Sequence, residues 1–363
     1  MKNKTLFCFV LLILIRISTA VFAHSADYQH GAVVVQIDGG TRYQTWEGIG
    51  ASFTPFDMEG IYKAHDPSQP ETVSVIAAQK EEIARLLYSE LGITRTRFVL
   101  RGFEPSNDND DPLTLNPAGF EWVNSTVDAS IEFMKIGQAY GLQEGWLSFA
   151  IDRGHQEAWR RLGDSPCALD PAQIDEEVEW LLAAVLHLRD SGVETRYMAV
   201  NNEPDLCPPG YKIEIADMVS IIKRLGARLR QEGLNTHIVV SDGWIPQNAL
   251  LYMQAALDDP DARPYVGALA YHSYDAYGNP DVLRQSAEGN PPHDAAEIRT
   301  QIRDLAAQYD LPVWMTEVCY CTPIEGFGFF ELAVLRLNHL FDELTITHVS
   351  AFDGMNVAFI ERA

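Results

Sequence analysis

Short apolar runs alternate along the chain with longer segments in which apolar residues recur at helical spacing. The short runs are rich in β-branched and aromatic residues, which is typical of strands that are buried on both faces. We therefore predict eight strands. They cover residues 46–53, 94–100, 145–151, 197–201, 237–241, 266–271, 313–316 and 348–352.

The segments between these strands carry helix signals. Residues 175–188 place four apolar side chains on one face and acidic residues in the first turn, where the helix dipole favours them. Similar patterns predict helices over residues 83–91, 215–232, 294–309 and 331–344. We count seven helices between the eight strands, and this alternation favours parallel strands joined by right-handed crossovers. The predicted fold is a closed (β/α)₈ barrel, with an open doubly wound sheet as the runner-up.

The N-terminus has the organisation of a secretory signal. Lys2 and Lys4 precede an apolar run over residues 6–15, and a small residue, Ala23, closes the segment. The run is too short to span a bilayer. We predict a signal peptide over residues 1–23 and an exported protein, secreted or periplasmic, without stable insertion into a membrane.

Residues 24–44 form a predicted N-terminal β extension, because residues 32–37 alternate as a strand does. Residues 45–363 form the predicted catalytic barrel. The chain ends at Ala363, soon after the eighth strand. Either the eighth helix is short or the sequence is truncated, and we expect an incomplete C-terminal side domain in the second case.

The charge balance narrows the choice of partner. The 363 residues include 27 lysines and arginines against 51 aspartates and glutamates, which gives a net charge of −24. Binding to nucleic acid needs clustered cations, and anionic lipids attract polybasic segments, so neither partner fits this chain. A neutral small molecule or polymer suits it better.

Four cysteines remain after cleavage of the signal, namely Cys167, Cys207, Cys319 and Cys321. An oxidising compartment permits disulfides, and four cysteines allow three pairings. We favour the Cys167–Cys207 pairing. A zinc site is the alternative, but Cys319-x-Cys321 lacks the second closely spaced pair of known zinc modules, so we predict no metal.

Acidic residues stand at the carboxyl ends of many predicted strands, where barrel enzymes gather their chemistry. We expect branched apolar side chains to fill the barrel interior, so acids at the strand ends are informative. The ends in order carry Glu104, Asp152, Glu203, Asp242, Tyr274, Glu317 and Asp353.

Glu203 and Glu317 stand out among these residues. Glu203 follows the fourth strand, and we expect Pro204 to restrict it to extended geometry. Glu317 ends the seventh strand, so both carboxylates should face the same barrel mouth. Either glutamate alone could be an ordinary surface or turn residue. Two carboxyl groups over one pocket, however, serve glycoside hydrolysis, in which one protonates the leaving oxygen and the other attacks the anomeric carbon.

The sequence resembles the clan A glycoside hydrolases, and among them family thirty. The resemblance is carried by residues 46–52, by Asn202-Glu203-Pro204-Asp205 and by Thr316-Glu317. It implies a retaining β-glycosidase with Glu203 as acid/base and Glu317 as nucleophile, and it assigns Arg97 to the support of the nucleophile. The family includes glucosylceramidases, β-1,6-glucanases and xylanases, so a β-linked oligo- or polysaccharide is the implied substrate, and no cofactor is expected.

The chain departs from the family pattern at two strand ends. Residues 148–153 replace a Trp-Ser-Pro-Pro turn after the third strand, and Asp353 stands where clan members usually place a tryptophan. These differences leave the subfamily and the sugar open.

Further residues of the mouth are candidates for substrate binding. Asn202 could donate a hydrogen bond to a substrate hydroxyl, and the resemblance places a histidine or tyrosine at His272 or Tyr274 beside the nucleophile. Trp244 and Trp159 follow strands five and three, and they either stack on sugar faces or pack in the core.

A catalytically inactive carbohydrate-binding barrel is the main alternative function. A cysteine- or metal-dependent hydrolase is a third reading, although no base is evident beside Cys319.

Overall fold

The computed structural model describes the greater part of the chain. The described residues are 38–53, 79–100, 109, 111–120, 122, 126–150, 160, 162–163, 167–207, 211–275, 293–318 and 328–354. Within them eight parallel strands form a closed barrel in chain order, and β1 pairs with β8. This closure confirms the (β/α)₈ prediction and excludes the open sheet. The strands are β1 (Gly48–Phe53), β2 (Arg95–Leu100), β3 (Glu144–Phe149), β4 (Tyr197–Ala199), β5 (His237–Gly243), β6 (Val266–His272), β7 (Val313–Glu317) and β8 (Ala351–Gly354).

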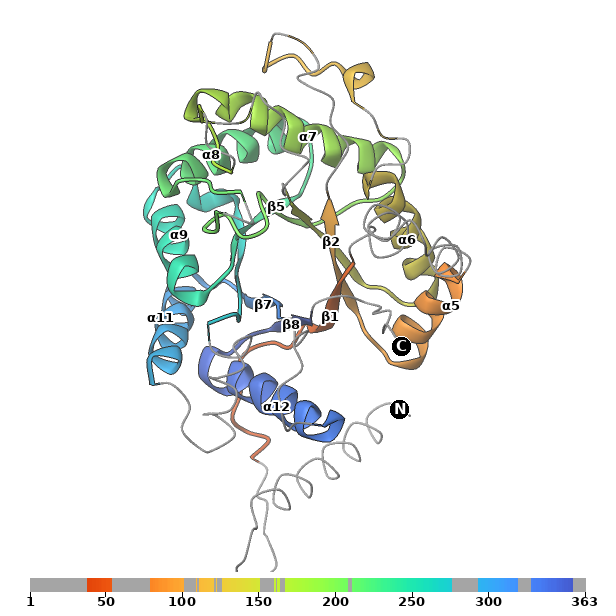
Figure 1. The fold of residues 1–363 in the computed structure, drawn as a ribbon, viewed down its shortest axis with the longest axis vertical. Coiled ribbons are helices and arrows are strands. Elements are labelled where there is room, and N and C mark those ends of the chain that lie inside the picture. The colour runs from red at the N-terminus through yellow and green to blue at the C-terminus, as the bar shows by residue number, and fades with distance from the viewer. Residues whose placement is uncertain are drawn as a thin grey trace, which may run out of the picture.

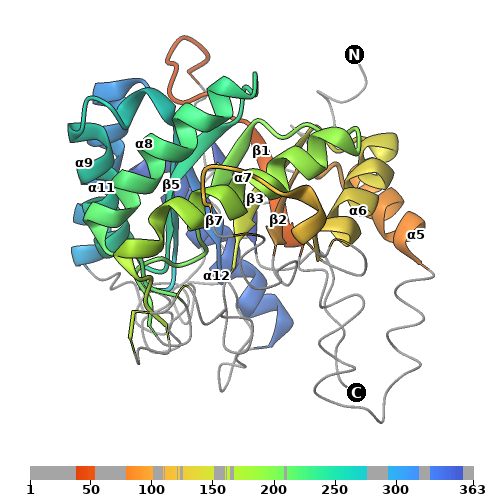
Figure 2. The ribbon, with the colours of Figure 1, turned by 90° about the horizontal axis from the view of Figure 1, so that it is seen from above.

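Helices surround the strands as an outer ring (Figure 1). In the described residues one α-helix lies in each connection from β1 to β8, as the sequence pattern predicts. These helices are α5 (Lys80–Ala84), α6 (Thr126–Tyr140), α7 (Ile174–Asp190), α8 (Ile215–Gln231), α9 (Pro246–Asp258), α11 (His293–Tyr309) and α12 (Phe329–Asp342). Two of them continue into wider π-helical turns, α5 into η1 (Arg85–Glu90) and α12 into η6 (Glu343–Thr347). Figure 2 shows the same ring from the side. Short 3₁₀ turns are η2 (Pro117–Gly119), η4 (Pro171–Gln173) and η5 (Arg263–Tyr265).

The main hydrophobic core lies between the strands and the helices. α8 is typical, because Ile221, Ile222 and Leu225 on its inner face are fully buried while its outer face is charged. Burial of such a stripe is the chief source of stability for an amphipathic helix. The strands therefore reach the barrel mouth from a rigid, packed wall.

The barrel interior is not the branched apolar filling that we expected. Trp146, Trp314 and Arg95 are buried there, and the arginine lies 4.3 Å from the centre of the Trp314 ring. Asp353 accepts hydrogen bonds from Arg95 Nε and Trp146 Nε1, both at 3.0 Å. Large side chains fit because small residues face them; a Cβ on Gly50 would lie 2.1 Å from Asp353 Oδ1. The interior is thus filled by a few large residues with polar partners.

Several predictions about the chain ends fall outside the described residues. They include the signal peptide over 1–23, the strand at 32–37 and the segment after residue 354. The proposed domain boundaries therefore stay predictions. The structure does test the favoured disulfide and confirms it, with Cys167 and Cys207 joined at a Cα–Cα distance of 5.7 Å. No helix among the described residues is long and apolar enough to cross a bilayer.

Candidate active site

Glu203 and Glu317 come together over the carboxyl ends of the strands. Glu317 is the last residue of β7, and Glu203 follows the short strand β4. One oxygen from each carboxylate and one nitrogen of His272 all lie within 4.8 Å of one another. The two glutamate side chains keep only 13% and 12% of their surface exposed. They therefore share one small, largely desolvated space that still opens to solvent.

The backbone at Glu203 differs from our expectation. We predicted extended geometry before Pro204, but Glu203 has a φ of 52°, in the left-handed region. The physical reason is a tertiary contact, because the Glu203 amide donates to the carbonyl oxygen of Asp242 at 2.9 Å. Asp242 is also left-handed, with a φ of 58°. Two non-glycine residues in this costly conformation at adjacent strand ends mark a locally constrained site.

Arg97, fully buried on β2, holds the nucleophile candidate. Its Nη1 donates to Glu317 Oε2 at 2.7 Å, and its Nη2 donates to Asp242 Oδ2 at 2.7 Å. Nη2 also donates to the side-chain oxygen of Asn202. That contact orients the Asn202 amide, so its NH₂ group faces away from Arg97. One guanidinium thereby fixes three side chains from three different strand ends.

His272 contacts Glu203, and Tyr274 contacts Glu317. The His272 imidazole lies with Nδ1 3.0 Å from Glu203 Oε1 and with Nε2 3.0 Å from Asp242 Oδ1. The Tyr274 hydroxyl donates to Glu317 Oε1 at 2.8 Å. The register of β6 and β7 explains this placement, because it pairs His272 with Glu317 across the ladder.

Asp242, at the end of β5, is a residue whose role sequence reasoning missed. It is fully buried and accepts hydrogen bonds from Arg97, His272, Ser148 at 2.5 Å and Thr316 at 2.7 Å. We noted it among the acidic strand ends but did not select it. The available signal was its position, since a lone aspartate closing an apolar strand must find cationic partners when the barrel closes.

The electrostatics of the cluster separate the two glutamates. Burial raises the pKa of Glu203, and the negative charge of Glu317 adds to this effect. Burial acts on Glu317 in the same direction, but the positive charges of His272 and Arg97 outweigh it and lower the pKa of Glu317. Glu203 therefore favours the protonated form and Glu317 the ionised form, which is the division between an acid and a nucleophile.

His272 and Asp242 complete the charge balance. Burial would lower the pKa of His272, but Glu317 and Asp242 raise it to about 10. Burial would raise the pKa of Asp242, but Arg97 and His272 hold it well below its ordinary value. With Glu203 protonated, the cations Arg97 and His272 balance the anions Asp242 and Glu317. The buried cluster is then neutral as a whole.

Among the described residues, Glu203, His272 and Glu317 lie close enough together to hold a metal ion. The hydrogen bonds favour a different use. A metal-bound imidazole must be unprotonated at the ligating nitrogen, whereas both nitrogens of His272 face carboxylates. The arrangement suits proton transfer and charge stabilisation.

The two tryptophan candidates are not brought to the glutamate pair by any described contact. Trp244 follows β5, is half-buried, and its backbone amide donates to Asp205 Oδ1 at 2.8 Å. Trp159 lies outside the described residues, as do Glu104 and Asp152. A sugar-stacking role for either tryptophan stays a prediction.

Comparison with known proteins gives structural neighbours only. No family model and no curated protein matches the chain. A glycoside hydrolase family 30 subfamily 8 xylanase from Clostridium acetobutylicum is 17% identical, with a TM-score of 0.58 over 88% of this chain and 66% of that chain. An endo-β-1,6-glucanase is 16% identical, with a TM-score of 0.59 over 88% of this chain and 67% of that one. SrfJ from Salmonella typhimurium is 15% identical, with a TM-score of 0.63 over 86% and 65% of the two chains.

These neighbours share the barrel fold with this chain. The chain spans about two thirds of the length of the xylanase. The resemblance to family thirty that the sequence motifs indicate is thus confirmed at the level of the fold.

Proposed function

We propose that this protein is an exported, retaining glycoside hydrolase that cleaves β-linked glycans. One observation carries the proposal: the carboxylates of Glu203 and Glu317 approach within 4.8 Å, with opposite shifts of their pKa values. Retaining enzymes place their carboxyl groups about 5–5.5 Å apart, and inverting enzymes leave more room for a water molecule.

The first step uses the two carboxyl groups in concert. Glu203 gives its proton to the glycosidic oxygen as the bond from that oxygen to the anomeric carbon breaks. Glu317 forms a bond to the same carbon, and the aglycone leaves as an alcohol. Arg97 and Tyr274 hold the two oxygens of Glu317, so the nucleophile enters the reaction already oriented.

The second step reverses the role of Glu203. Once Glu317 is esterified its negative charge is gone, and with it one cause of the raised pKa of Glu203. The ionised Glu203 then takes a proton from water, the water oxygen bonds to the anomeric carbon, and Glu317 leaves as a carboxylate.

The substrate class and location follow from supporting observations. Structural neighbours of the same fold are named as a xylanase and a β-1,6-glucanase, and the acidic chain favours an uncharged polymer. Export is supported by the pattern of residues 1–23 and by the Cys167–Cys207 disulfide.

The test is hydrolysis of aryl β-glucosides, β-xylosides and β-galactosides and of β-1,6-glucan, with product analysis. Glu317→Gln should abolish turnover. Glu203→Ala should spare the first step on substrates with good leaving groups, and azide should rescue its turnover with retained configuration. Full activity of Glu317→Gln would refute the mechanism, and glycan binding without hydrolysis by the wild type would favour the inactive carbohydrate-binding barrel.

A further inference from the structure

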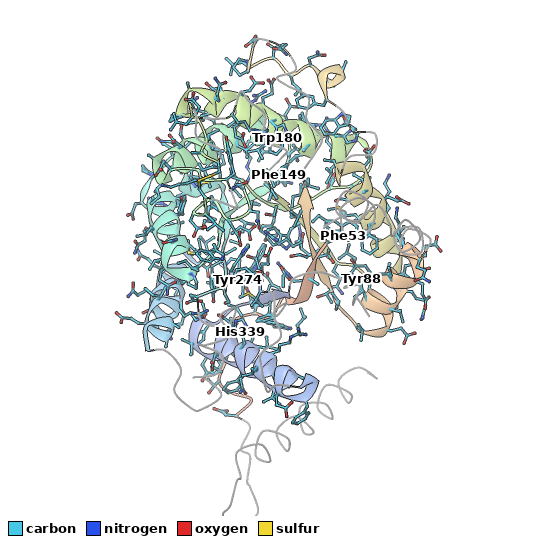
Figure 3. All side chains as sticks on the ribbon, in the orientation of Figure 1. Phe53, Tyr88, Phe149, Trp180, Tyr274 and His339 are labelled. Carbon is cyan, nitrogen blue, oxygen red and sulfur yellow. A yellow bond between two sulfur atoms is a disulfide. The ribbon has the colours of Figure 1, made fainter. Side chains whose placement is uncertain are left out.

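A second buried charged cluster lies on the outer side of β6, away from the two glutamates. Arg299 of α11 is 1% exposed, and Glu343 at the start of η6 is fully buried. We call Arg299, Glu343, Ser273 and Asp275 the Arg299 cluster. Figure 3 labels Tyr274, inside the ring of helices, and His339 on α12, whose Nε2 lies 3.1 Å from Glu343 Oε1.

Arg299 donates hydrogen bonds to Ser273 and Asp275, the two chain neighbours of Tyr274. Its Nη1 and Nη2 donate to the two oxygens of Asp275 at 3.1 and 3.2 Å. Nη2 also donates to Ser273 Oγ at 3.0 Å, and Nε donates to Glu343 Oε1 at 2.9 Å. The Ser273 hydroxyl donates onward to Glu343 Oε1 at 2.8 Å. The residues before and after Tyr274 are therefore fixed to one planar guanidinium.

The same short segment is tied to the nucleophile strand. The Ser273 amide donates to the carbonyl oxygen of Glu317 at 3.1 Å. Tyr274 thus lies between two anchored residues, Ser273 and Asp275. Its hydroxyl donates to Glu317 Oε1 at 2.8 Å. A hydrogen bond of this length is lost with a small rotation of the segment, since it weakens steeply with distance and angle.

We propose that Arg299 and Asp275 are positioning residues that hold the Tyr274 hydroxyl on the nucleophile Glu317. This inference rests on the proposed function. The hydrogen bonds described above for the Arg299 cluster lead to the backbone at the end of β6, and the cluster acts on Glu317 through that segment. Its charges belong to three places, namely Asp275 after β6, Arg299 on α11 and Glu343 on η6. His339 on α12 also faces Glu343, and burial lowers the pKa of this histidine.

The informative variant is Asp275→Asn. It removes one carboxylate from Arg299 but leaves Glu343 to balance the buried guanidinium, so the fold should survive. Arg299→Lys is the second variant, because it keeps the charge and loses the two-pronged grip. Asp259→Asn is the matched control: it removes a salt bridge to Lys223 at 2.9 Å, and Asp259 lies before the start of β6, whereas Tyr274 lies after its end.

We expect Asp275→Asn to lower kcat about tenfold on aryl glycosides while KM changes less than about twofold, since misplacement costs rate more than binding. The Tyr274 hydrogen bond is one cause of the lowered pKa of Glu317, so its loss should move the acidic limb of the rate profile to higher pH. Combined with Tyr274→Phe, Asp275→Asn should lower kcat no further than Tyr274→Phe alone.

The outcomes are distinguishable. Multiplied effects in the double variant would overturn the inference, because Asp275 would then act independently of Tyr274. The inference would also be overturned if Asp275→Asn had the same kcat and the same acidic limb as Asp259→Asn. It would be overturned as well if Arg299→Lys were folded and had the kcat of the wild type. A wild type inactive on every glycan overturns the proposed function and this inference together, whereas an active wild type beside an unaffected Asp275→Asn overturns the inference alone.

Discussion

Asp242 should be the residue on which the stability of the catalytic cluster depends most strongly, and the dependence should change with pH. Its buried carboxylate faces two cations, Arg97 at 2.7 Å and His272 at 3.0 Å. Asp242→Asn preserves the shape and removes the charge. In the variant the cations Arg97 and His272 face one anion fewer, so the pKa of His272 should fall, while Arg97 stays paired with Glu317.

The magnitude follows from the titration of His272. Its pKa is about 10 in the folded wild type against an ordinary value of 6.5, so the folded protein keeps a proton that the unfolded chain releases above pH 6.5. This stabilisation is complete below pH 6.5 and is lost as the pH rises through 10, at about 1.4 kcal/mol per pH unit. Between pH 6 and pH 9 it falls by about 3 kcal/mol.

In Asp242→Asn this slope should become shallower, because His272 loses one of the carboxylates that raise its pKa against burial, while Glu317 remains. Loss of one partner of a buried ion pair costs about 3–5 kcal/mol, and we expect that cost at pH 6. At pH 9 the difference in unfolding free energy between wild type and variant should be smaller, by at most about 3 kcal/mol, since the wild type has by then lost most of the stabilisation from His272. The contributions of the other histidines cancel in the comparison.

Urea unfolding of both proteins at pH 6 and pH 9 measures the two differences. Asp353→Asn is the matched control, because Asp353 is equally buried but its partners are Arg95 and Trp146, neither of which titrates in this range. That variant should be destabilised by a similar amount at both pH values. A cost of Asp242→Asn that is the same at pH 6 and pH 9 would refute the protonated His272 and the charge balance built on it.

Two further predictions concern Arg97 and the Cys167–Cys207 disulfide. Arg97→Lys should reduce kcat at least about a hundredfold and move the acidic limb of the pH–rate profile to higher pH, because one ammonium cannot hold Glu317 and Asp242 together. A pH–rate profile on an aryl glycoside measures kcat and the acidic limb. A kcat near that of the wild type would contradict the role of the guanidinium. Removal of the disulfide by a Cys167→Ala, Cys207→Ala double variant should lower the unfolding free energy by about 4 kcal/mol, from the separation of 40 residues that it closes. Urea titration at pH 7 measures the loss, and a change below about 1 kcal/mol would contradict the loop-closure argument.

Much of the fold could be predicted from the sequence, because strands buried on both faces appear as short apolar runs rich in β-branched and aromatic residues. The strands at 237–243 and 313–317 each contain a short apolar run, Ile238–Val240 and Val313–Met315, and lie between amphipathic helices, so their ends could be placed within two residues. Since parallel strands in a barrel all end at one mouth, locating the ends also brought Glu203 and Glu317 together before any coordinates.

The backbone at Glu203 and the partners of the buried arginines could not be predicted, because they depend on contacts between residues far apart in the chain. The left-handed backbone of Glu203 follows from a hydrogen bond to Asp242, and the local preference before Pro204 points the other way. Arg95 was likewise missed, and Arg97 was selected only through the family resemblance, because both residues resemble the ordinary charged positions of a half-exposed strand. Their meaning depends on which carboxylates the closed barrel places opposite them.

The two arginines of β2 form the same kind of buried ion pair at two levels of the barrel. Arg95 and Arg97 point inward two residues apart, and each meets an aspartate from a distant strand, Asp353 and Asp242 respectively. In the deeper layer the other partners are Trp146, Trp314 and Glu47, whose carboxylate accepts hydrogen bonds from Arg95 and Trp314, and the pair stabilises the interior. In the upper layer the partners are His272 and Glu317, whose pKa values are shifted by the cluster. The difference between structure and proposed catalysis in this barrel therefore lies in the titratable groups that surround each arginine, and the same pH comparison of Asp242→Asn and Asp353→Asn separates them.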